Sequence, residues 1–165
     1  MTQSETSIRP LGRITAMEIK NRKFLVVGMG VSGVAAARFL KRRGAEVTIT
    51  DRAPADRLKP HLAEVEDLGV KLELGGHSDE SFAAVDVIIA SPGVPLTITP
   101  LRRAAEAGIP VMGEIELAAA LISKPIVAVT GTNGKTTVTT LVGEMLKQSG
   151  KHVFVGGNIG KPLIG

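Results

Sequence analysis

The stretch Lys23-Phe-Leu-Val-Val-Gly-Met-Gly-Val-Ser-Gly33 decides the fold of this chain. Its apolar first half predicts a buried strand, and its glycines predict a tight turn that opens a helix at about Ser32–Arg43. A second predicted strand, Glu46–Thr50, is followed by Asp51, about 20 positions after the glycine turn. Strand, glycine turn, helix and acidic residue together predict a domain that binds a nucleotide through its diphosphate.

Strand and helix signals continue to alternate along the chain. Further strands are predicted at 70–74, 85–90 and 109–112, and further helices at 56–68, 100–107 and 114–122. Pro60 should limit the first of these helices to starting near that residue, because proline does not fit a helix interior. The alternation indicates an α/β fold with a Rossmann-like, doubly wound parallel sheet. We expect a polar tail at 1–16, with Met17 as an alternative start, and this domain at 17–113.

A second glycine-rich loop, Gly131-Thr-Asn-Gly-Lys-Thr-Thr137, follows the predicted strand Ile126–Thr130. It is a variant of the phosphate-binding loop, because Val129 stands where the strict pattern has glycine. Glycines let backbone N–H groups turn toward phosphate oxygens, Lys135 offers a cation to them, and Thr136 offers a hydroxyl to Mg²⁺. The alternative is a Gly-Lys-Thr turn that binds nothing. The expected ATP-binding residues are Gly131, Thr132, Asn133, Gly134, Lys135, Thr136 and Thr137.

The helix after this loop carries apolar residues at helical spacing, which predicts one buried face. They are Val138, Leu141, Val142 and Met145. A further strand is predicted at Val153–Val155, and there the signals stop. Two strands and one helix cannot bury both faces of a sheet. We therefore expect residues 114–165 to be the incomplete beginning of a second domain, able to self-associate through its exposed apolar surface.

Composition narrows the partners of this chain. A net charge of +4 raises the question of nucleic acid, but four Phe and no Tyr or Trp leave few rings for stacking on bases. The basic cluster Lys41–Arg43 precedes Gly44 at a helix end, where cations complement the helix dipole. No apolar run is long enough to insert into a membrane. The lack of cysteine fits a reducing cytoplasm.

Candidate ligand residues of the first domain lie at strand ends, where open α/β sheets bind ligands. Asp51 could accept from a ribose or base, or it could simply cap a helix. As a strand-end aspartate it is expected to carry little packing. His77, beside two glycines, is interpreted as a turn residue. The loop Ser91-Pro-Gly-Val-Pro95 follows a later predicted strand.

From about Met17 to Gly165 the chain resembles the Mur ligases, and within them the ligases that add D-glutamate. The resemblance rests on the two glycine loops, on Ser91–Pro95, on Gly113-Glu-Ile-Glu-Leu117 and on Gly156-Gly-Asn-Ile-Gly160. It implies a cytoplasmic enzyme of peptidoglycan precursor synthesis. With ATP and Mg²⁺ it joins UDP-N-acetylmuramoyl-L-alanine to D-glutamate through an acyl phosphate.

The resemblance also implies roles for residues of this chain. Lys135 and Thr136 would be catalytic, with Thr136 contacting Mg²⁺ and the other metal ligands lying beyond Gly165. The residues implied for the UDP substrate are Gly28, Gly30, Val31, Ser32, Gly33, Asp51, Arg52, Gly75 and Asn158. Where the family can have threonine after the acidic residue, this chain has Arg52. The fragment alone is expected to be inactive.

Two other functions stay open on the residues alone. The chain could be an NAD-binding oxidoreductase domain whose match at Gly131–Thr137 is accidental. It could also be a nucleotide-binding module without catalysis. Binding of NADH rather than UDP or ATP would favour the first of these.

Overall fold

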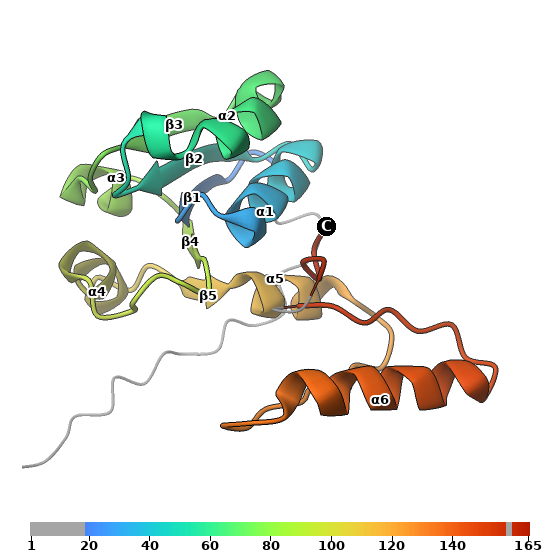
Figure 1. Ribbon diagram of the computed structural model, residues 1–165. Helices are drawn as coiled ribbons and strands as arrows, with labels where there is room; N and C mark the ends of the chain where they lie inside the picture. Colours follow the sequence, from blue (N-terminus) through green and yellow to red (C-terminus); the bar gives the residue numbers. More distant parts are fainter. Residues whose placement is uncertain (1–18, 158–159) are drawn as a thin grey trace, which may run out of the picture.

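The computed structural model describes residues 19–157 and 160–165 and contains one parallel five-stranded sheet (Figure 1). The strand order is β3-β2-β1-β4-β5, so the chain starts in the middle and builds outward in both directions. The strands are β1 (Lys23–Val27), β2 (Glu46–Asp51), β3 (Lys71–Leu74), β4 (Val87–Ala90) and β5 (Val111–Gly113). This order confirms the predicted Rossmann-like, doubly wound sheet.

Each strand is followed by a helical segment, as parallel connections require. The α-helices are α1 (Val31–Arg42), α2 (Lys59–Val65), α3 (Asp79–Ala83), α4 (Thr99–Glu106), α5 (Glu114–Leu121) and α6 (Lys135–Gln148). Short 3₁₀ helices, η2 (Ala55–Arg57) and η3 (Glu66–Leu68), flank α2. The helix predicted at 56–68 is therefore broken into three, and α2 starts beside Pro60 as expected.

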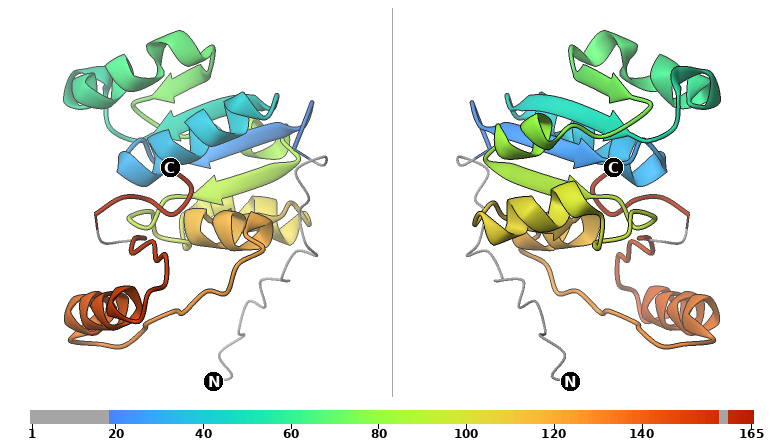
Figure 2. Two further views of the ribbon diagram at one scale, coloured as in Figure 1. Left: turned by 90° about the vertical axis from the view of Figure 1, so that its right-hand side faces the viewer. Right: turned by 90° about the vertical axis from the view of Figure 1, so that its left-hand side faces the viewer.

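Helices cover both faces of the sheet (Figure 2), and each face carries its own apolar cluster. On one face α1, α2 and α5 pack over Phe24 and Val26, both fully buried. On the other face α3 contributes Phe82 and α4 contributes Leu101. Both pack against Leu25, which lies in β1 between Phe24 and Val26. The central strands β1 and β4 are buried on both sides, which is why their sequences are almost entirely apolar.

The second predicted unit differs from expectation. Residues 126–130 and 153–155 are not strands, so both predictions are wrong for this structure. A strand needs a hydrogen-bonded neighbour, and no strand of the described residues pairs with either segment. The side chain of Val127 is 67% exposed.

Helix α6 forms as predicted, but its apolar face is not buried. Val138, Leu141 and Met145 are all exposed. Figure 1 shows α6 lying apart from the sheet, at the end of extended connections. Gly143 is its buried residue, and an added Cβ there would overlap a methyl group of Val155. Helical spacing thus predicted the apolar stripe correctly and its burial wrongly, because burial needs a surface to pack on.

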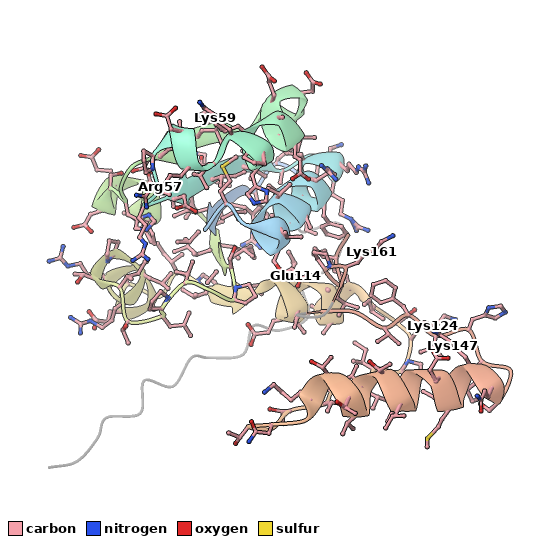
Figure 3. The ribbon with its side chains drawn as sticks, viewed as in Figure 1. Arg57, Lys59, Glu114, Lys124, Lys147 and Lys161 are labelled. Atoms are coloured by element: carbon pink, nitrogen blue, oxygen red, sulfur yellow. The ribbon has the colours of Figure 1, made fainter. Side chains whose placement is uncertain are left out.

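The chain returns to the sheet at its last residues. Ile164 is 7% exposed within the apolar layer of α1, and its backbone N–H donates to Glu114 Oε1 at 2.8 Å. Glu114 is the first residue of α5 and is only 2% exposed. Figure 3 labels Glu114 and, in the returning segment, Lys161. Glu114 and Ile164, which are 50 positions apart in sequence, are therefore held to one another beside the sheet.

Candidate functional site

A pocket of about 500 Å³ opens at the carboxyl ends of β1, β2 and β4. This is the point where the strand order reverses direction, and such crevices bind ligands in open α/β sheets. The lining residues are Gly28, Gly30, Val31, Ser32, Asp51, Arg52, His77, Ser91, Pro92, Gly93, Val94, Pro95 and Ile98.

The turn between β1 and α1 forms the floor of this pocket. Gly28 has φ +93°, a left-handed conformation that disfavours any side chain, and its carbonyl oxygen accepts from Ser91 Oγ at 3.0 Å. At Gly33 an added Cβ would overlap that same carbonyl oxygen of Gly28. Only glycine at this position lets α1 start so close to the strand.

The start of α1 is suited to binding an anion. Its N-cap residue is Gly30, which has no side chain, and the first turn contains no acidic residue. The backbone N–H groups at the start of a helix have no partner within it and attract negative charge. Val31 is 61% exposed and lines the pocket together with Ser32. A diphosphate fits this position by charge and by hydrogen bonding.

Asp51 holds the turn in place with both carboxylate oxygens. Its Oδ2 accepts from the backbone N–H of Met29 at 2.7 Å, and its Oδ1 accepts from Ala53 N–H at 2.8 Å. The aspartate therefore joins the β1–α1 turn to the end of β2. The expectation that Asp51 carries little packing did not include these two hydrogen bonds, which give the side chain a structural role of another kind.

Replacing Asp51 with alanine should destabilise the domain as well as disturb the pocket. Two partly buried N–H groups would lose their acceptor, at a cost of about 1–3 kcal/mol each. Chemical denaturation of Asp51→Ala measures this loss. Asp86→Ala is the matched control, because Asp86 accepts one backbone N–H, from Lys23, at an exposed position. Equal stability of the two variants would contradict the structural role of Asp51.

The loop between β3 and α3 borders the pocket on the β2 side. Gly75 and Gly76 N–H donate to Asp51 O at 2.9 and 3.2 Å, and His77 lines the pocket. Gly75, which the resemblance placed beside the base, is exposed and is not among the lining residues. Two residues further on, His77 occupies the position facing the pocket.

Glu73 anchors the same loop from β3. Its Oε1 accepts from the Ser78 backbone N–H at 2.7 Å. Burial raises the pKa of the Glu73 carboxyl, but hydrogen bonds with Ser81 and Ser78 and the charge of His77 outweigh burial and hold the pKa below its ordinary value. Because the folded-state pKa is lowered, this carboxylate stabilises the loop above its unfolded pKa, and the contribution is lost as the pH falls.

The second glycine loop turns at two glycines with positive φ. Gly131 and Gly134 have φ +148° and +74°, and Gly134 caps the start of α6. Lys135 Nζ donates to Gly131 O at 2.5 Å and to Thr132 O at 3.3 Å. The lysine thus lies back over the loop that precedes it. All residues from Gly131 to Thr137 are exposed.

The donors near this loop fit magnesium only together with a phosphate ligand. Within residues 19–157 and 160–165, no group of three His, Asp or Glu side chains could hold a metal. Thr136, in the first turn of α6, provides one exposed hydroxyl oxygen. Mg²⁺ commonly takes one or two protein oxygens and completes its shell with substrate phosphates and water.

The structure brings six of the predicted substrate residues to one pocket: Gly28, Gly30, Val31, Ser32, Asp51 and Arg52. Gly33 lies beneath them as the close-packing residue, and Asn158 lies outside the described residues. The individual residues of the β4–α4 loop, Ser91 to Ile98, and His77 were missing from the predicted site. The position of both loops at strand ends was the available signal.

No helix in the part of the chain that the structure describes has the length and hydropathy to cross a bilayer.

Fold and pocket together define a Rossmann-like α/β domain, followed by a segment with a glycine-rich loop and one helix. The sequence profile of the Mur ligase MurD-like, N-terminal domain matches residues 22–113, and that of the Mur ligase middle domain matches residues 129–163. The chain belongs to the Mur ligase family.

Similar proteins carry the name UDP-N-acetylmuramoylalanine–D-glutamate ligase. The protein of Desulfosudis oleivorans is 64% identical over 149 residues, which cover 90% of this chain and 32% of that protein. The protein of Geotalea daltonii is 55% identical over 148 residues, covering 90% and 33%. The chain therefore spans about a third of the length of these relatives.

Among solved structures, a pseudomurein peptide ligase type C from Methanothermus fervidus is 32% identical, with a TM-score of 0.51. The match covers 79% of this chain and 27% of that one. The murein peptide ligase mpl from Psychrobacter arcticus is 23% identical with a TM-score of 0.52, again over 79% and 27%, and supports the fold alone.

Proposed function

We propose that this chain is the substrate-binding part of an ATP-dependent ligase that adds D-glutamate to UDP-N-acetylmuramoyl-L-alanine. The pocket carries the proposal: it joins an uncapped helix start, suited to a diphosphate, to the acidic end of β2. The names of relatives that are 64% and 55% identical support the choice of substrates. The proposal places the protein in peptidoglycan precursor synthesis in the cytoplasm. A chain without cysteine fits this reducing compartment.

In the proposed reaction the γ-phosphoryl group of ATP moves to a carboxylate oxygen of the alanyl substrate, giving an acyl phosphate and ADP. The amine nitrogen of D-glutamate then attacks the carbonyl carbon, the carbon–oxygen bond to phosphate breaks, and the amine loses a proton. Magnesium bound with ATP would neutralise phosphate charge. The residues of this chain would bind and orient: α1 the UDP diphosphate, and Gly131–Thr137 the phosphates of ATP.

The exposed loop Gly131–Thr137 supports only the binding part of this scheme. Its carboxylate metal ligands, and any wall that would exclude water from it, would have to come from outside the described residues. We therefore expect the 165-residue chain to bind a uridine nucleotide and to lack ligase activity. The exposed apolar side chains of α6 also support self-association of the chain by itself.

A thermal-shift titration tests the substrate class. UDP at a hundredfold excess over its Kd should stabilise the chain by about 2.7 kcal/mol. For a domain of this size that is a melting-temperature rise of at least roughly 5 °C. The shift should occur without ATP and Mg²⁺, because the pocket at α1 is complete without the second loop. A shift with NAD and none with UDP would refute the proposal and favour an oxidoreductase domain.

A further inference from the structure

His77 is held over the end of β2 by a buried hydroxyl. Thr50 is 0% exposed, and its Oγ1 lies 2.9 Å from His77 Nδ1 and 3.2 Å from Gly76 O. Thr50 directly precedes Asp51, so the imidazole is tied to the same strand end that carries the acidic residue of the pocket.

The two contacts of Thr50 are hydrogen bonds at the same time in only one arrangement of protons. A carbonyl oxygen can only accept, so the single hydroxyl proton of Thr50 is donated to Gly76 O. Thr50 Oγ1 must then accept from His77, which places the imidazole proton on Nδ1. In the neutral ring Nε2 is left with a free lone pair and is a hydrogen-bond acceptor.

The ring is fixed before any ligand binds. Phe82, which is 1% exposed, contacts it edge to face, with ring centroids 5.9 Å apart and an interplanar angle of 81°. His77 is half-buried and lines the pocket, and its Nδ1 is the ring nitrogen that faces the hydroxyl of Thr50.

We propose that His77 Nε2 accepts a hydrogen bond from the nucleoside half of the bound uridine nucleotide. The inference rests on the proposed function, because the ligand is the one assigned there. The start of α1 takes the diphosphate, and β2 is the neighbouring strand in the sheet. In Rossmann-like domains the nucleoside lies toward the end of that strand. Ribose hydroxyls and the uracil imide are the N–H and O–H donors in this half.

His77 Nε2 differs from the charged groups on this side of the pocket in having no partner among the described contacts. Each oxygen of Asp51 already accepts from one backbone N–H and keeps a lone pair for a further donor, and Arg52 can only donate. The Glu73 carboxylate is turned to the Ser78 backbone on the other side of the loop. His77 Nε2 is therefore an acceptor with no partner within the chain's described contacts, on a ring that cannot turn without breaking its bond to Thr50.

Two substitutions separate a ligand contact from a structural role. In His77→Asn the amide nitrogen takes the place of Nδ1 and can still donate to Thr50, but nothing replaces Nε2. In His77→Gln the amide oxygen reaches the place of Nε2 and can accept, while the bond to Thr50 is lost. We expect His77→Asn to raise the Kd for UDP roughly three- to tenfold, the effect of one hydrogen bond. His77→Gln should stay within about twofold of the unsubstituted chain.

Calorimetric titration with UDP and with 2′-deoxy-UDP, beside melting curves, gives the result. A larger rise of the Kd in His77→Gln than in His77→Asn would show that His77 acts only through Thr50, and would overturn the proposal. Unchanged affinity in both variants, or an equal loss in both, would also overturn it. If the Asn effect disappears with 2′-deoxy-UDP, the partner is the 2′-hydroxyl; if it persists, the partner is another nucleoside donor. Both of these results support the proposal.

The tautomer is tested independently of any ligand. Nitrogen-15 spectra of the imidazole at about pH 8 should show a protonated Nδ1 and an unprotonated Nε2. The opposite tautomer would overturn the acceptor role. If the unsubstituted chain did not bind UDP, the proposed function would fail, and the inference with it. That outcome is distinct from failure of the inference alone, in which UDP binds but His77→Asn does not bind it more weakly than His77→Gln does.

Discussion

Lys135→Ala should reduce ligation by the full-length enzyme at least about a hundredfold, the scale seen when one charged or hydrogen-bonding group is removed from a developing anion. The reason is the role proposed for Lys135 as the cation that binds the phosphates of ATP, and its Nζ lies over Gly131 and Thr132. Release of ADP and of phosphate measures the loss. Affinity for UDP should stay unchanged, because Lys135 is not among the residues of the α1 pocket.

The same helix offers a control for the lysine. Lys147 lies in the last turn of α6, is exposed, and is paired with Glu144 at 2.7 Å. Lys147→Ala removes the same charge from the same element and should leave ligation within about twofold, since exposed pairs contribute little. If Lys135→Ala weakened UDP binding as much as it weakened ligation, the two nucleotide sites could not be separate.

Gly33→Ala should cause the largest loss of stability of any single methyl addition in the first domain. The added Cβ would overlap the carbonyl oxygen of Gly28, and backbone atoms cannot move aside as a flexible side chain can. Overpacking commonly costs about 1–3 kcal/mol, and a clash with backbone belongs at or above the upper end of that range. Thermal unfolding should show a melting temperature lower by roughly 10 °C or more.

Gly30→Ala is the matched variant for this experiment. Gly30 lies three residues earlier in the same turn, has φ −84°, and an added Cβ would have nothing within 4 Å. Its stability should change by less than about 1 kcal/mol. Similar losses in both variants would mean that the turn tolerates no side chain at all, and that the contact with Gly28 is not the cause.

The first domain was largely predictable from sequence because its signals are local. The apolar run Lys23–Val27 and the glycines after it determine a buried strand and a close turn wherever they occur in a parallel sheet. The strands at the end of the chain were not predictable in the same way. Residues 126–130 have the composition of a strand, but pairing depends on neighbours that the residues themselves do not specify.

The sequence predicted which residues lie at the site, but it predicted less of the contacts that these residues make. The glycines and Asp51 were found because they occur at fixed spacing after a strand. That Asp51 Oδ2 accepts from the Met29 N–H, and that Thr50 orients His77, depends on contacts between residues 22 and 27 positions apart. No spacing pattern in the sequence contains that information, so His77 was interpreted as a simple turn residue.

The chain leaves the apolar layer of α1 and α5 after Ile122 and is held to the same layer again at Ile164, which makes the intervening segment an excursion from the sheet. The entropy lost on closing a flexible loop grows only with the logarithm of its length, about 0.6 kcal/mol for each doubling. An excursion built in this way can gain or lose whole elements at small cost to the domain that holds its ends. The fold can therefore accept an inserted unit between these two points while the geometry of the pocket at α1 stays the same.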